Sequence, residues 1–161
     1  MKQLIKKQMM VAFAVVFFAV VLISNGQAED AASDFTLPNL AGEQVSLGSF
    51  NGNQNVLLVF GTTWCPYCVS EIPELNQLQE ELGSGLKILS VYVQEKASKV
   101  KPFTEKKTVK YELLIDQPGD VARAYGVRGI PAVFFIDKSG MIRHSSTGAL
   151  DLEEIRELAQ G

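Results

Sequence analysis

The chain has 161 residues, which is long enough for one domain and too short for two ordinary ones. Its composition, 47% hydrophobic and 20% charged, is that of a folded globular protein and excludes a disordered or fibrous chain. The net charge of −3, with no basic patch, argues against a nucleic-acid partner.

The first 28 residues differ from the rest of the chain. Three lysines precede an uncharged apolar run over residues 9–23, and Gly26-Gln27-Ala28 follows. This order is typical of a secretory signal that is cleaved after Ala28. An uncleaved membrane anchor is the alternative, although 15 apolar residues are fewer than the roughly 20 that span a bilayer. In both interpretations residues 29–161 form one domain outside the cytoplasm, because the lysines stay on the cytoplasmic side.

The first predicted elements after this segment are strands. Two short extended pieces, residues 35–37 and 44–47, flank the turn formers Asn39 and Gly42, which predicts a β-hairpin. Residues 56–60 are all apolar without alternation, which is typical of a central strand covered on both faces.

The middle of the chain alternates helices and strands. Apolar residues at helical spacing predict a helix that follows the two cysteines and ends at Gly83. A buried strand is expected over residues 86–93, a helix over 97–107 that Pro102 breaks early, and a short strand over 111–115. The six lysines of residues 96–110, with Glu95 and Glu105 among them, are typical of a solvated helix face.

The last third completes the pattern. We expect a brief helix over residues 120–125, strands over 132–136 and 141–146, and a final helix that Asp151 caps. Strands that alternate with helices give a parallel core, and the terminal hairpin adds antiparallel edge strands. The predicted fold class is therefore α/β, with a mixed central sheet flanked by helices and an added N-terminal β-hairpin.

The two cysteines lie in the segment Trp64-Cys65-Pro66-Tyr67-Cys68. A zinc site needs about four ligands, and the chain offers only these thiols and one histidine, so we expect no metal site. A structural disulfide over so short a loop would add little stability. A reversible dithiol–disulfide couple is the interpretation that remains.

The position of the pair supports redox chemistry. A strand ends just before Cys65, and Pro66 suits the first turn of a helix. The N–H groups and the dipole at a helix N-terminus favour a thiolate, which is the attacking species in disulfide exchange. Cys65 is therefore the expected nucleophile, and Cys68, one turn along and more buried, is expected to resolve the mixed disulfide.

Two further positions are candidates for the site. Pro131, in Gly129-Ile130-Pro131, cannot donate a ladder hydrogen bond and should lie at a turn or strand start. Glu71 follows Cys68 by three residues and shares its helical face. On position alone Glu71 is equally well an ordinary exposed acid of the first helical turn.

These motifs together resemble the thioredoxin superfamily, and more narrowly the extracytoplasmic, membrane-tethered thioredoxin-like proteins of the TlpA/ResA group. The resemblance covers nearly everything after Ala28. It rests on the redox segment with Gly-Ile-Pro about 60 residues later, and on four further matching stretches: residues 34–47, 68–75, 125–131 and 135–140.

The resemblance implies a role for each site residue. Cys65 would be the nucleophile, Cys68 the resolving thiol, and Glu71 an acid that tunes the cysteine pKa values or shuttles a proton. Pro131 would be cis, so that the backbone of Ile130 faces a partner peptide. The residues assigned to substrate contact are Trp64, Pro66, Tyr67, Ile130 and Pro131.

The resemblance also suggests partners. It implies a reductant of protein disulfides, with the haem-binding thiols of apocytochrome c among the substrates and a membrane protein as electron donor. The chain carries no flavin, haem or nucleotide signature, so no cofactor is expected.

The sequence departs from its relatives at two places. Thioredoxin has a buried aspartate six residues before its first cysteine, where this chain has Val59, which leaves Glu71 as the nearest proton-transfer candidate. The intervening pair Pro66-Tyr67 is commoner in glutaredoxins than in reductive members of the group. A disulfide-donating oxidase therefore stays open as an alternative.

Two rival functions come from other classes. In a peroxiredoxin, a threonine precedes the attacking cysteine by three residues, as Thr62 does here, but the expected proline is absent because position 58 is Leu58. A copper-delivery protein would use both thiols and His144, the only histidine, which we expect to be a surface residue on an edge strand.

Overall fold

The computed structural model describes residues 30–160. The segment predicted as a signal or anchor, residues 1–28, lies outside this range. Within it, no helix is long and apolar enough to span a membrane.

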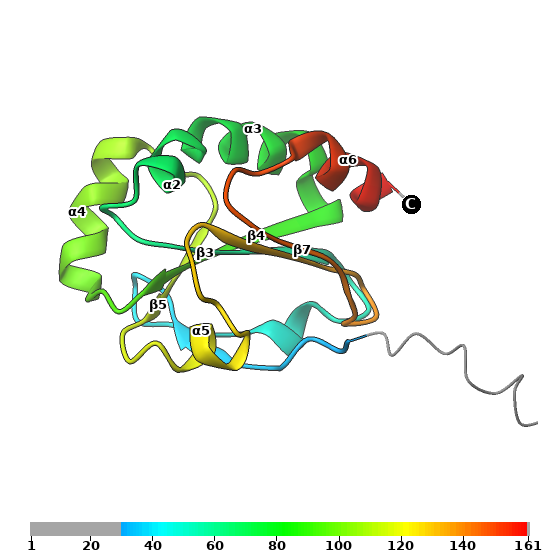
Figure 1. Cartoon of the computed structure of the whole chain (residues 1–161), viewed down its shortest axis with the longest axis horizontal. Coiled ribbons are helices and arrows are strands. Elements are labelled where there is room, and N and C mark those ends of the chain that lie inside the picture. The colour runs from blue at the N-terminus through cyan, green and yellow to red at the C-terminus, as the bar shows by residue number, and fades with distance from the viewer. Residues whose placement is uncertain (1–29, 161) are drawn as a thin grey trace, which may run out of the picture.

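A five-stranded sheet forms the centre of the domain (Figure 1). Its strands lie in the order β5-β4-β3-β6-β7. Strands β3, β4 and β5 are parallel to one another, β6 pairs antiparallel with β3, and β7 pairs antiparallel with β6. The expected mixed sheet is confirmed, but the terminal hairpin does not lie wholly at the edge, because β6 pairs directly with β3. The strands are β3 (Asn55–Gly61), β4 (Leu86–Val93), β5 (Glu112–Asp116), β6 (Ala132–Ile136) and β7 (Ile142–Thr147).

Helices cover both faces of this sheet. Figure 1 shows α3 and α6 above the sheet and α5 below it, on the same side as the blue and cyan start of the described chain. The helices are α2 (Pro66–Ser70), α3 (Ile72–Leu82), α4 (Ala97–Lys107), α5 (Asp120–Ala124) and α6 (Leu152–Gln160). Asp151 caps α6 as predicted, because its Oδ1 accepts hydrogen bonds from the N–H groups of Glu153 and Glu154.

The predicted N-terminal hairpin is also present. It consists of β1 (Thr36–Pro38) and β2 (Gln44–Ser46), which pair antiparallel as a separate two-stranded sheet. A single bridge between Asn39 and Leu114 connects the hairpin to β5. The chain then makes one 3-10 turn, η1 (Leu47–Phe50), and enters β3.

The central strand β3 explains why two cores form. Its side chains alternate, so that Leu57 and Val59 pack with α3, α4 and α6, while Leu58 and Phe60 pack with the hairpin and α5. All seven residues of β3 are buried, as the uninterrupted apolar run predicts. The strand is thereby fixed on both faces and holds the segment that follows Gly61 in a defined place.

Two helix predictions were wrong in detail, and both errors involve proline. Pro73 has no N–H to donate to the carbonyl of Val69, so the single expected helix is divided into α2 and α3 at Glu71. Pro102 does not break α4, which continues to Lys107. There the proline removes only the bond to Ser98, while buried residues on both sides of it keep the helix packed on the sheet.

Candidate active site

The two cysteines lie where β3 gives way to α2. Cys65 is the N-cap of α2, Pro66 is its first residue, and Cys65 Sγ accepts a hydrogen bond from the N–H of Cys68 at 3.2 Å. The sulfur atoms are bonded to each other, and the Cα atoms lie 5.3 Å apart. The predicted placement of Cys65 at a helix N-terminus is confirmed.

The relative burial of the two cysteines was predicted wrongly. Cys65 is only 4% exposed, whereas Cys68 is half-buried. The reason is that Cys65 Sγ folds back over the helix terminus, where it meets the N–H of Cys68. Cys68 instead lies against Gly61, where a β-carbon would come within 3.2 Å of Cys68 Sγ.

Aromatic side chains surround the disulfide on the surface. Trp64 is 67% exposed and Tyr67 is 66% exposed, and they are the exposed large hydrophobic residues of the part of the chain that the structure describes. Large apolar side chains left in water beside a reactive group are typical of a contact surface for another molecule.

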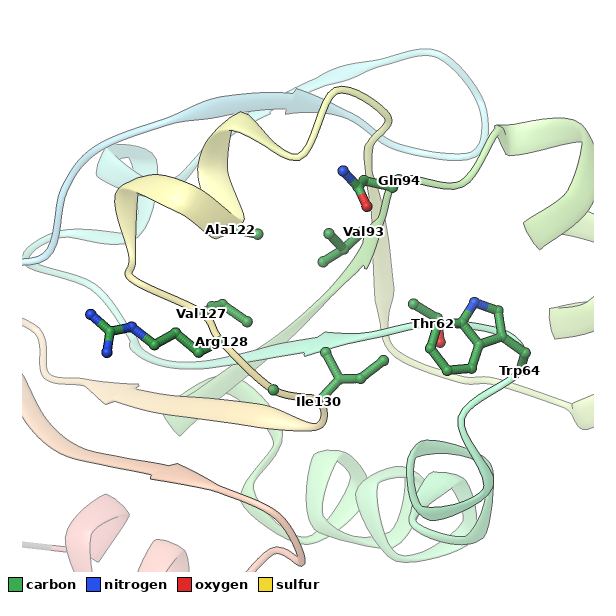
Figure 2. Close-up of a pocket in the computed structure, with 9 residues that line it drawn as sticks. Thr62, Trp64, Val93, Gln94, Ala122, Val127, Arg128 and Ile130 are labelled. Atoms are coloured by element: carbon green, nitrogen blue, oxygen red, sulfur yellow. The ribbon is translucent and has the colours of Figure 1, made fainter.

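The segment before β6 forms the other side of the site. The Ile130–Pro131 peptide bond is cis, and Pro131 is buried directly before Ala132, the first residue of β6. A pocket of about 350 Å³ separates this segment from Trp64 (Figure 2). It is lined by Thr62, Trp64, Val93, Gln94, Ala122, Val127, Arg128, Gly129 and Ile130.

Glu71 is not the exposed acid that its position also allowed. It is 7% exposed, and its Oε1 accepts a hydrogen bond at 2.9 Å from the N–H of Leu150, between β7 and α6. Oε2 is buried without a hydrogen-bond partner. Burial raises the pKa of the Glu71 carboxyl, the Leu150 hydrogen bond lowers it, and nearby Glu74 raises it further, so that the net pKa lies above its ordinary value.

The raised pKa of Glu71 gives a pH-dependent stability. The folded state holds the Glu71 proton more tightly than the unfolded state. The contribution of this proton to the free energy of unfolding is therefore fully present below the unfolded pKa, about 4.3, and is lost as the pH rises through the folded pKa. Glu71→Gln removes this loss. We expect the difference in Tm, variant minus wild type, to increase between pH 4 and pH 8 by a few degrees.

Thermal unfolding of both proteins across this pH range measures the effect. Glu105→Gln, an exposed acid on α4, is the control for the general loss of one charge. A Tm difference for Glu71→Gln that stays constant from pH 4 to pH 8 would contradict this explanation.

Sequence reasoning missed the carboxylate of Glu95. It was grouped with the solvated lysine-rich helix, yet it is 5% exposed and accepts hydrogen bonds from Thr63, two residues before Cys65. Its signal in the sequence was slight: it is an acid two residues after a buried strand, at the same edge of the sheet as the cysteines.

The residues behind the rival functions are placed as follows. His144 lies on the edge strand β7 as predicted, and its Nδ1 is 2.8 Å from Glu154 Oε1. Among residues 30–160, no three metal-ligating side chains gather into a metal site. Thr62 Oγ1 is buried and has no hydrogen-bond partner.

The sheet order, the disulfide at the start of α2 and the cis proline before β6 define a thioredoxin-fold thiol-disulfide oxidoreductase. The model of the AhpC/TSA family matches residues 28–145, and the chain belongs to this family.

Individual relatives support the same activity. Over 127 residues the chain is 35% identical to the thiol-disulfide oxidoreductase ResA of Geobacillus thermodenitrificans, covering 78% of this chain and 72% of that protein. A thiol:disulfide interchange protein of the thioredoxin family from Chlorobium tepidum superposes with a TM-score of 0.73 at 28% identity, covering 83% and 97% of the two chains. An exposed lipoprotein thioredoxin of Streptococcus pneumoniae gives 0.67 at 26%, covering 80% and 98%.

Proposed function

We propose that this protein reduces disulfides of other proteins outside the cytoplasm through the Cys65–Cys68 couple. Its substrates would include the haem-binding thiols of apocytochrome c, and a membrane protein would return electrons to it. Residues 1–28 would direct the domain across the membrane, either as a cleaved signal or as an anchor. Similarity to an exposed lipoprotein thioredoxin supports this location.

The observation that carries the proposal is the placement of Cys65. Its sulfur receives an N–H group at the start of α2, which favours the thiolate. Trp64 and Tyr67 flank it with exposed apolar surface, and Ile130 lies across the pocket. We propose that a substrate peptide contacts Trp64, Pro66, Tyr67 and the Ile130–Pro131 segment while its disulfide meets Cys65.

The exchange proceeds in two steps. The Cys65 thiolate attacks one sulfur of the substrate disulfide, a mixed disulfide forms, and the other substrate sulfur leaves as a thiolate and takes up a proton. Cys68 then loses its proton and attacks Cys65 Sγ, which releases the second substrate thiol. Two electrons pass to the substrate, and the Cys65–Cys68 disulfide remains.

Glu71 is the carboxyl that we propose for the second step. Its buried Oε2 has no hydrogen-bond partner and would carry the exchanged proton, and the raised pKa lets the carboxyl hold that proton closer to neutral pH than an exposed glutamate does. Val59 occupies the position of thioredoxin's buried aspartate and cannot serve.

We expect a low reduction potential for the couple, near the thioredoxin value of about −270 mV. Strong oxidants stabilise the reduced thiolate, but here Pro66 and Tyr67 between the cysteines carry no charge that would add to this stabilisation. Equilibration of the domain from Glu29 onward against defined thiol buffers measures the potential.

A potential near roughly −120 mV would instead indicate a disulfide-donating oxidase and would overturn the reductive direction. The same preparation can be tested for peroxide consumption, because rapid turnover with peroxide would favour the peroxidase alternative.

A further inference from the structure

The carboxylate of Glu95 is buried beside the segment that leads to the disulfide. Its Oε2 accepts the N–H of Thr63 at 2.7 Å, and its Oε1 accepts the Thr63 hydroxyl, also at 2.7 Å. The ammonium group of Lys99, on the first turn of α4, lies 2.5 Å from Oε1. The exchange steps above use none of these groups.

The backbone around Glu95 is bent so that the carboxylate reaches Thr63. Gln94, the first residue after β4, has a φ of 56°, in the left-handed region that residues other than glycine adopt uncommonly. The N–H of Gln94 donates to the carbonyl of Asp116 on β5 at 2.9 Å. The chain therefore turns sharply between β4 and α4, and Glu95 is directed back toward the end of β3.

Glu95 stays ionised in this buried place. Burial raises the pKa of its carboxyl, but the hydrogen bonds from Lys99 and Thr63 outweigh burial and leave the net pKa below its ordinary value. A charged acceptor makes stronger hydrogen bonds than a neutral one, so each of the two hydrogen bonds from Thr63 is stronger than one to a neutral acceptor would be.

Thr63, which Glu95 holds, lies in a short connection whose far end is fixed by α2, where the carbonyl of Cys65 accepts the N–H of Val69 at 3.1 Å and its sulfur accepts the N–H of Cys68. Four residues, 62–65, connect the last residue of β3 to the first residue of α2. Within this connection the N–H of Cys65 makes one long hydrogen bond, 3.4 Å, to the carbonyl of Thr62. The Glu95 carboxylate is therefore the main anchor of Thr63, which directly precedes the exposed Trp64.

We propose that Glu95 is a positioning residue for thiol–disulfide exchange: its hydrogen bonds to Thr63 fix the placement of Trp64 and Cys65 before the substrate. This inference rests on the proposed attack by Cys65. It predicts that loss of the carboxylate makes the connection mobile and slows exchange with a protein disulfide while the fold is retained.

Glu95→Ala tests the proposal with two measurements. Trp64 is the only tryptophan of the chain, so the time-resolved anisotropy of its fluorescence reports directly on the connection. The reaction of the reduced protein with insulin disulfides, followed over pH 5–9, gives the rate at the high-pH plateau, where a changed Cys65 pKa no longer matters. We expect faster local motion of Trp64 and a plateau rate roughly tenfold lower.

Glu112→Ala is the matched control. Glu112 also accepts hydrogen bonds from Asn39 and Lys87, but it is the first residue of β5 and pairs with Leu89, in the middle of β4 and four residues before its end. It should leave both the Trp64 motion and the plateau rate unchanged. Glu95→Gln should recover most of the rate, because an amide oxygen can still accept the Thr63 N–H.

A folded Glu95→Ala protein with wild-type anisotropy and rate would refute the proposal, as would an equal loss in Glu112→Ala. If Glu95→Ala does not fold, Thr63→Val decides by the same two measurements, because it removes only the hydroxyl bond. Failure of the proposed function is recognised separately: exchange that persists in Cys65→Ser would refute attack by Cys65 and leave the anisotropy result standing.

Discussion

Cys65→Ser should abolish the reduction of protein disulfides, with a loss of more than about 10³-fold, because a hydroxyl cannot replace the attacking thiolate. Cys68→Ser should behave differently. Cys65 remains at the start of α2, where the N–H of residue 68 still points at its sulfur, so it attacks normally. Without the resolving thiol the mixed disulfide accumulates.

The two variants can be compared by non-reducing electrophoresis after reaction with a disulfide-containing protein. We expect covalent adducts with Cys68→Ser and none with Cys65→Ser or the double variant. Adducts of equal yield from both single variants would contradict the assignment of Cys65 as the nucleophile, and the absence of adducts from Cys68→Ser would refute the exchange scheme. His144→Ala, on the edge strand β7, should retain full activity.

Much of the fold followed from local patterns in the sequence. The apolar run of β3 predicted burial on both faces, and Leu57, Leu58 and Phe60 are fully buried. Asp151 predicted its helix start because capping depends on neighbours two and three residues away. The cysteine pair and Pro66 likewise predicted a redox site at a helix N-terminus, because all three residues lie within one turn of the chain.

What the sequence left open depends on contacts between distant residues. Glu71 is buried because Leu150, 79 residues later, donates a hydrogen bond to it, and Glu95 contacts Thr63, 32 residues earlier. No local pattern distinguishes such carboxylates from solvated ones. The internal place of β6 was missed for a similar reason, because strand order is a property of the whole sheet.

Gly61→Val should separate the two steps of the exchange. Gly61 is buried at the end of β3, and a β-carbon there would lie 3.2 Å from Cys68 Sγ, closer than side chains normally pack, and in contact with Cys68 Cβ at 3.4 Å. Valine adds two further methyl groups, so we expect Cys68 to be displaced from its place beside Cys65. We expect the resolving step to slow about 100-fold, since displacement of a reacting group by about 1 Å has that effect.

Chain neighbours aside, the atoms within 4 Å of a β-carbon at Gly61 belong to Cys68 and not to Cys65. The first attack by Cys65 should therefore be slowed much less than the resolving step. Rapid acid quenching of Gly61→Val during turnover should therefore capture the mixed disulfide, which wild type resolves too quickly to accumulate. Gly85→Val is the control, because a β-carbon at Gly85 meets no atom within 4 Å. Quenched samples of Gly61→Val that contain no more mixed disulfide than those of Gly85→Val would show that Cys68 does not need its place against Gly61.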